Sequence, residues 1–203
     1  MQQTAKCKIK GIRPLLINCF SNDTISLERK VRTGVAGNDP EEWKKSYTAT
    51  KDGQLYVEPS YIFGCLRAAS FHTKSGKGSI QAKFSATLQV LTEKILFNRY
   101  IPKLNEFLEC SQEDPVYLDV RSVKNPGTKG RNVRYRVAMS TGWETEFELQ
   151  WDNTIISSGQ VEQVLLDAGS LIGLADGRSI GFGRFEVVSL EVLETKNAKT
   201  ASA

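Results

Sequence analysis

Histidine and paired cysteines are scarce in this sequence of 203 residues, and their scarcity narrows the chemistry that it can carry. His72 is the one histidine, which leaves little material for catalytic triads or for metal sites. The four cysteines, Cys7, Cys19, Cys65 and Cys110, never have the C-x-x-C spacing of zinc ligands. We therefore expect no metal site, no cofactor and no catalytic residue, and we predict free thiols that are buried or half-buried.

Long apolar runs are missing as well. No run approaches the roughly 18 residues that a membrane-spanning helix needs, so we expect no membrane partner. The first six residues lack the apolar core of a signal peptide, which favours a cytoplasmic protein. With 40% hydrophobic and 25% charged residues, the composition is typical of a globular protein. The length fits one large domain with insertions.

The positive charge of the chain is concentrated in one segment. The net charge is +4, yet residues 119–136 contain six cations and a single carboxylate, Asp119. That segment therefore has a net charge of +5, which leaves −1 for the rest of the chain. Local basic charge indicates a binding surface for an anionic partner. The six cations are Arg121, Lys124, Lys129, Arg131, Arg134 and Arg136.

The first quarter of the sequence predicts one strand followed by an insertion. Residues 5–18 begin with lysines that alternate with Cys7 and Ile9, which is the pattern of a strand with one wet face, and Pro14 marks its end. Residues 19–57 form the insertion. It contains a second basic cluster (Arg29, Lys30 and Arg32), a short helix from an Asp39 cap to about Ser46, and a hairpin turn at Asp52-Gly53.

The middle of the sequence predicts two helices, a hairpin and a strand. Apolar residues recur at helical spacing from Pro59 to about Thr73 and again over residues 82–96. Residues 116–139 form two β-prone arms around a Pro-Gly turn. Residues 143–151 alternate strictly between apolar residues and glutamates or glutamine, which is typical of a half-buried strand. We interpret the three tryptophans, Trp43, Trp143 and Trp151, as core residues.

The last quarter predicts a helix, a glycine-rich loop and a strand. Ser157 or Ser158 caps the helix, and Gly169 is expected to end it. The last strand covers residues 185–193, and residues 196–203 are expected to form a disordered tail. The element order reduces to βα…ββαβ. We therefore predict an α+β fold: a single ferredoxin-like, RRM-like domain over residues 1–195, with an antiparallel sheet, helices on one face and an inserted hairpin.

The basic hairpin is the first candidate binding site. In its second arm Arg134 and Arg136 alternate with Val133, Tyr135 and Val137, so that one face is cationic and the other apolar or aromatic. Guanidinium groups beside an aromatic ring are typical of proteins that bind single-stranded nucleic acid. The alternative is a solvated flap that binds nothing.

The glycine-rich stretch over residues 169–185 is the second candidate site. It holds five of the sixteen glycines together with Arg178 and Arg184. Glycine is required where the backbone has a positive φ or lies close to another backbone or a ligand. A helix precedes the stretch and a strand follows it, which is the reverse of the dinucleotide and P-loop motifs. A tight turn with surface arginines is the alternative interpretation.

These motifs together resemble the RAMP superfamily of CRISPR-associated proteins. One match is the glycine-rich loop that runs into the last strand. A second is the opening strand that ends in Pro-Leu-Leu at residues 14–16. A third is the helix introduced by residues 57–67. The loop residues that carry the likeness are Gly173, Gly177, Arg178, Gly181, Phe182, Gly183, Arg184 and Phe185.

Within that superfamily the chain looks most like the filament-forming subunit that makes up the crRNA backbone, or a phage or prophage relative of it. The resemblance implies that residues 116–139 are a protruding β-hairpin thumb. It also implies antiviral defence, self-association along the strand, and other CRISPR effector subunits as partners. It favours RNA over single-stranded DNA as the ligand and leaves both open. The expected nucleic-acid-binding residues are Lys124, Lys129, Arg131, Arg134, Tyr135, Arg136, Arg178, Arg184, Arg29, Lys30 and Arg32, with Gly173, Gly177, Gly181 and Gly183 shaping the loop.

Two other functions are compatible with the sequence. His72 could act as the general base of a metal-independent endoribonuclease. A phage structural or assembly protein could use the glycine-rich loop as a contact between subunits. We take a non-catalytic binding module as the leading hypothesis.

Overall fold

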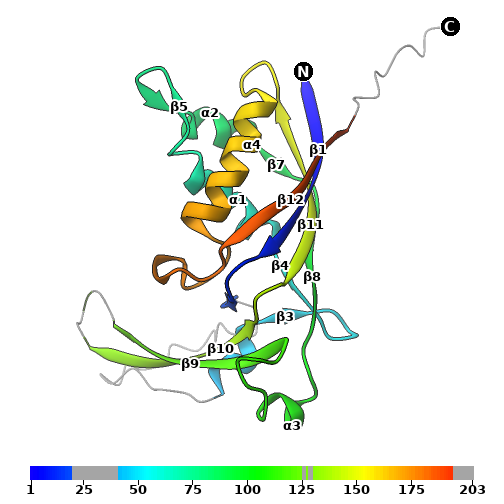
Figure 1. Cartoon of the computed structure of the whole chain (residues 1–203), viewed down its shortest axis with the longest axis vertical. Helices are drawn as coiled ribbons and strands as arrows, with labels where there is room; N and C mark the ends of the chain where they lie inside the picture. The colour runs from blue at the N-terminus through cyan, green and yellow to red at the C-terminus, as the bar shows by residue number, and fades with distance from the viewer. Residues whose placement is uncertain (20–40, 125–126, 128–129, 194–203) are drawn as a thin grey trace, which may run out of the picture.

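A computed structural model describes residues 1–19, 41–124, 127 and 130–193 (Figure 1). Several predictions lie outside these residues. They are the basic cluster Arg29, Lys30 and Arg32, the cation Lys129, the Asp39 helix cap and the tail over residues 196–203.

The fold is a mixed α/β structure built on a large antiparallel sheet of seven strands. The strands follow one another across the sheet in the order β12-β1-β11-β8-β4-β3, and β7 pairs with β11 beside this path. The bounds of these strands are β1 Gln2–Gly11, β3 Thr48–Ala49, β4 Gln54–Val57, β7 Gln89–Val90, β8 Ile95–Tyr100, β11 Glu144–Asp152 and β12 Phe185–Leu193.

The two central strands, β1 and β11, have the predicted alternation. Cys7 and Ile9 of β1 are fully buried against the helices, while the lysines between them point to the open face of the sheet. On that open face Lys6 Nζ lies 2.7 Å from Glu146 Oε1, and Lys8 Nζ lies 2.8 Å from Glu144 Oε2. One face of the sheet is therefore core, and the other is a layer of paired charges.

Three helices cover the core face of the sheet, as Figure 1 shows: α1 (Pro59–Ala69), α2 (Gln81–Thr87) and α4 (Ser158–Asp167). Ser157 is the one of the two candidate serines that caps α4, and its side chain forms a reciprocal capping box with Gln160. Trp143 and Trp151 are fully buried and Trp43 is 4% exposed, which confirms that the tryptophans belong to the core.

The predicted hairpin over residues 116–139 is confirmed. It consists of β9 (Val116–Lys124) and β10 (Arg131–Met139), and β2 (Leu15–Ile17) joins them in a second sheet of three strands. The short helices are a 3-10 helix over Glu42–Lys45, α3 (Leu104–Phe107) and a 3-10 helix over Arg178–Ile180. A small hairpin of β5 (Lys74–Ser75) and β6 (Gly78–Ser79) follows α1.

Four predicted element boundaries were wrong. The opening strand, expected to end at Pro14, ends at Gly11, and Leu15–Ile17 forms β2 in the other sheet. The helix expected over residues 82–96 ends at Thr87, and the following residues enter β7 and β8, because short apolar runs fit a helix and a strand equally well. The helix expected to reach Thr73 ends at Ala69. Gly169 does not end α4: a π-helical turn continues over Ala168–Ile172, and Gly173 ends it with a φ of 87°.

Gly169 is needed for packing. A Cβ at this position would lie 2.1 Å from the carbonyl oxygen of Phe185, so that only glycine lets the helical turn approach β12. Within the described residues, no helix is long and apolar enough to span a membrane.

Candidate nucleic-acid interface

The glycine-rich loop lies between the helix layer and the hairpin sheet. All four glycines expected to shape it, Gly173, Gly177, Gly181 and Gly183, have a positive φ. The loop closes on itself through the Leu174 amide, which donates to the Gly183 carbonyl at 2.8 Å. It is fixed to β2 by the Asp176 amide, which donates to the Leu16 carbonyl at 3.0 Å. The loop is therefore a fixed part of the fold.

Helix α1 holds the start of the loop. The Cys65 thiol donates to the Gly173 carbonyl at 3.1 Å. Burial raises the pKa of this thiol to about 12, although the charges of Arg178 and Arg184 oppose the shift. The thiol is thus a neutral hydrogen-bond donor at the base of the loop.

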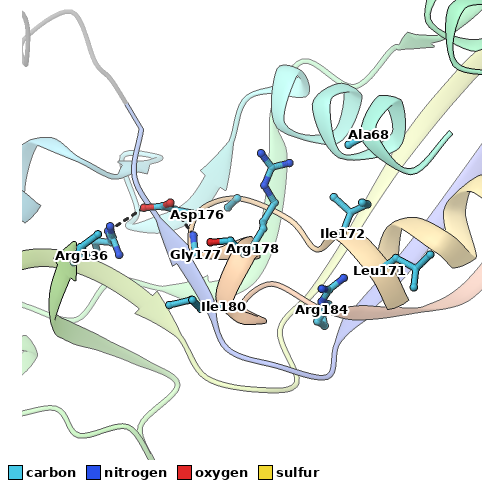
Figure 2. A pocket seen from close by; sticks show the side chains of 12 residues that line it. Ala68, Arg136, Leu171, Ile172, Asp176, Gly177, Arg178, Ile180 and Arg184 are labelled. Atoms are coloured by element: carbon cyan, nitrogen blue, oxygen red, sulfur yellow. Dashed lines mark hydrogen bonds and ion pairs between the residues drawn. The ribbon is translucent and has the colours of Figure 1, made fainter. Parts of the chain in front are cut away.

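Phe182 of the loop packs against a cluster that includes Tyr117 and Ala138 of the hairpin, and two contacts of charged side chains also join the loop to the hairpin. Arg136 Nε of β10 lies 2.9 Å from Asp176 Oδ2 (Figure 2). The angle between the two groups falls short of a hydrogen bond, so the contact is an ion pair. On the other side, the guanidinium carbon of Arg121 lies 4.4 Å from the centroid of the Phe182 ring, a cation–π distance.

The cationic face of the hairpin points toward the loop. In the register of the hairpin Arg121 lies opposite Arg134, and Asp119 lies opposite Arg136, so that these four side chains share one face. Asp119 is 3% exposed and accepts from Arg121 Nε at 2.8 and 2.9 Å. This hydrogen bond raises the pKa of Arg121. The fold therefore balances part of the hairpin's charge with Asp119 and Asp176.

An open cavity of about 630 Å³ borders the loop, and Figure 2 shows the side chains that line it. Arg178 is exposed on its wall, and Arg184 enters from the end of the loop. The Nη1 atom of Arg184 is buried and has no hydrogen-bond partner among the described residues. A buried donor without a partner costs about 1–3 kcal/mol, so an anion placed here would be stabilised.

Two smaller cavities continue this one along the loop. One of about 250 Å³ shares Ala175 and Arg178 with it and reaches the first turns of α1. The other, of about 380 Å³, shares Ile180 and extends to β9. We call the three cavities together the loop groove. Asp176 is the one carboxylate among the described residues that line it, against the five arginines Arg13, Arg121, Arg136, Arg178 and Arg184.

The structure separates the predicted site residues into three groups. Arg178 and Arg184 line the groove, and Arg136 lines it while it is paired with Asp176. Lys124 and Arg131 are exposed and lie opposite each other toward the end of the hairpin, and Arg134 is half-buried. Tyr135 packs against the hydrophobic core on the other face of the hairpin, so it is not the free stacking ring that the sequence suggested.

Sequence reasoning missed two residues of the third cavity, Arg13 and Tyr117. Arg13, Tyr117 and Phe182 line it together with Arg121. Arg13 precedes Pro14 and Tyr117 is the second residue of the hairpin, and neither belongs to a charge cluster or repeat that would have singled it out. The part of the chain with described coordinates holds no group of three or more histidine, cysteine or acidic residues placed to bind a metal ion.

Comparison with solved structures identifies a similar fold. No family model and no curated protein sequence matches this chain. A chain in the cryo-EM structure of the Type III-B Cmr-beta complex bound to cognate target RNA matches with a TM-score of 0.59 and 13% identity. The match covers 95% of this chain and 61% of that chain, so this chain spans about three-fifths of its length. The likeness shows the fold, a mixed α/β structure built on an antiparallel sheet.

Proposed function

We propose that the protein is a non-catalytic subunit that binds single-stranded RNA in the loop groove. The observation that carries the proposal is the pair Arg178 and Arg184, which lines the cavity of about 630 Å³, with the buried Arg184 Nη1 lacking a partner among the described residues. A phosphate oxygen would satisfy that donor through a charge-assisted hydrogen bond. The likeness to a chain of an RNA-bound effector complex supports RNA as the anion.

The groove offers distinct environments for phosphates and for bases. Phosphates would lie beside Arg178 and Arg184, where no carboxylate neutralises either guanidinium among the described contacts. A base would enter the third cavity, where Tyr117 and Phe182 supply aromatic surface and Arg13 and Arg121 supply cations. Arg136 would hold the loop in place and make no phosphate contact.

The open face of the sheet is poorly suited to RNA. The carboxylates of Glu144, Glu146 and Glu148 all project from that face of β11, and Lys6 and Lys8 are already paired with two of them. The positive charge of these two lysines is therefore neutralised, and they offer little attraction to phosphates. This contrast favours the loop groove over the sheet as the binding surface.

Subunit type and assembly belong to the proposal as well. The order β12-β1-β11-β8 with α1 and α4 on one face supports our proposal of a ferredoxin-like plan, in which the β9–β10 hairpin would serve as the thumb. We infer a backbone-type subunit that associates with copies of itself and with other effector subunits along the RNA. Adjacent copies would add avidity to a small individual footprint.

Photo-crosslinking tests the location of the RNA. Uridine strands that contain 4-thiouridine should crosslink to peptides of the glycine-rich loop and of β9, and Arg178→Ala/Arg184→Ala should weaken the crosslinks. Crosslinks confined to β1 and β11 would place the RNA on the open face and contradict the proposal. The same strands, end-labelled, should stay intact during incubation with the wild type. Cleavage that His72→Ala abolishes would instead support the endoribonuclease.

A further inference from the structure

A second cationic region lies outside the loop groove. Residues 59–92 contain no aspartate or glutamate, yet they contain four cations and the histidine. Together with one phenylalanine these side chains form a set that we call the helix-end patch: Arg67, Phe71, His72, Lys74, Lys77 and Lys83. All six are exposed.

Three consecutive elements bring the patch together. Gln81 Nε2 at the start of α2 donates to the Arg67 carbonyl in the last turn of α1 at 2.9 Å. The Ile80 amide donates to the Thr73 carbonyl at 3.1 Å and closes the segment that contains the β5–β6 hairpin. In the described part of the chain, none of the four cations of the patch forms an ion pair. Their charge therefore faces solvent uncompensated.

An aromatic ring stands among these cations. Phe71 is 57% exposed, although it is large and apolar. Its ring meets the edge of His72 at a centroid distance of 5.7 Å and an interplanar angle of 85°. An exposed ring beside uncompensated cations is the arrangement that holds a single strand: the ring stacks a base, and the cations contact the phosphates.

The patch continues the loop groove along α1. Ser60, Gly64 and Ala68 line the groove, and they recur at helical spacing on one side of α1. Phe71 follows Ala68 by three residues and lies just beyond the end of α1. Figure 1 shows the β5–β6 hairpin and the glycine-rich loop on the same, helix-covered side of the sheet.

We propose that the helix-end patch is a second contact site for the RNA strand that occupies the loop groove, with Phe71 stacking a base and Lys74 and Lys77 contacting phosphates. The inference rests on the proposed function and extends its footprint along α1. The exposed aromatic ring and the continuity with the groove favour RNA over an acidic protein surface as the occupant.

The charge component is tested by Lys74→Ala/Lys77→Ala in the full-length protein. The slope of log affinity against log salt for a long uridine strand should become shallower by about 0.7 for each phosphate interaction that the substitutions remove. The matched control is Lys6→Ala/Lys8→Ala, which removes the same charge from the open face, and its slope should equal that of the wild type. Equal slopes for the two double variants would overturn the inference.

The stacking component is tested by Phe71→Ala on uridine strands of graded length. The affinity of the variant for long strands should be lower than that of the wild type by about fivefold or more. Its affinity for strands that are short enough to fill only the groove should equal that of the wild type. A length-independent effect would contradict a second site.

The results also separate this inference from the proposed function. If the wild-type protein binds no single-stranded RNA, both the proposed function and the helix-end patch inference are contradicted. A wild type that binds normally, with patch variants indistinguishable from the control, removes the patch alone. If Lys74→Glu/Lys77→Glu changes self-association without RNA and leaves the salt slope unchanged, the patch contacts a second copy of the chain and the inference is overturned.

Discussion

Arg136 of the hairpin and Asp176 of the glycine-rich loop form an ion pair, with 2.9 Å between Nε and Oδ2, that joins the two parts of the candidate RNA site. The Arg136 side chain is 10% exposed and that of Asp176 is 34% exposed, so the pair is only partly screened by solvent. It places a carboxylate in a groove that otherwise carries positive charge. In the proposed RNA site, stability and RNA affinity would therefore make opposite demands on Asp176.

Asp176→Asn should separate these two demands. Loss of the carboxylate leaves the Arg136 guanidinium largely buried without its counter-ion, so the free energy of unfolding should fall by about 1–3 kcal/mol. The groove gains one unit of positive charge, so the affinity for single-stranded RNA should rise severalfold at low salt. Urea denaturation and fluorescence anisotropy measure the two effects. Glu146→Gln removes the same charge from the open face and should raise affinity far less.

The loop glycines should differ sharply in their tolerance of alanine. Gly183 has a φ of 69°, and a Cβ there would lie 2.0 Å from the Leu174 carbonyl oxygen, so Gly183→Ala must displace the loop. Gly181 has a φ of 90° with no atom within 4 Å of a Cβ, so Gly181→Ala should cost only the backbone strain of about 1–2 kcal/mol. Urea denaturation should give a much lower free energy of unfolding for Gly183→Ala than for Gly181→Ala. Equal destabilisation by the two substitutions would mean that the loop is not closely packed.

The thiols should differ in reactivity. Burial raises the pKa of Cys7 and Cys65 to about 12, whereas Cys110 is half-exposed. Mass spectrometry after brief alkylation of the native protein should find Cys110 modified and these two thiols protected.

The same shifts predict how stability depends on pH. A buried thiol whose pKa is raised keeps its proton in the folded state above the pH at which the unfolded thiol loses it. The contribution of the neutral thiol to the free energy of unfolding is therefore fully present below the pKa of the unfolded thiol. It is lost as pH rises above about 9. The free energy of unfolding should decline from pH 9 to pH 11, and the decline should be smaller in Cys65→Ala. An unchanged decline in that variant would contradict a neutral buried thiol.

Strong local signals predicted much of the fold. The strict alternation around Phe147 predicted β11, Asp52-Gly53 predicted the β3–β4 turn, and Ser157 predicted the start of α4. Each of these depends on interactions within a few residues, which a sequence displays directly. The predicted helix over residues 82–96 was wrong beyond Thr87, because the apolar spacing around Leu88 fits both a helix and a strand.

The features that the sequence did not predict depend on tertiary contacts between distant residues. Gly169 was expected to end a helix, but its lack of a side chain serves packing against Phe185. Tyr135 alternates correctly with the arginines, yet its face of the hairpin packs against the core. The groove residues Arg13 and Tyr117 lie about a hundred positions apart in the sequence, so only the fold brings them together.

The salt dependence of RNA binding tests the central claim most directly. Affinity for a single-stranded uridine RNA should fall linearly on a log–log scale as salt rises. In Arg178→Ala/Arg184→Ala the slope should be shallower by about 1.4, the equivalent of two phosphate contacts. A wild-type affinity that does not change with salt, or a double variant with the wild-type slope, would contradict RNA binding in the loop groove.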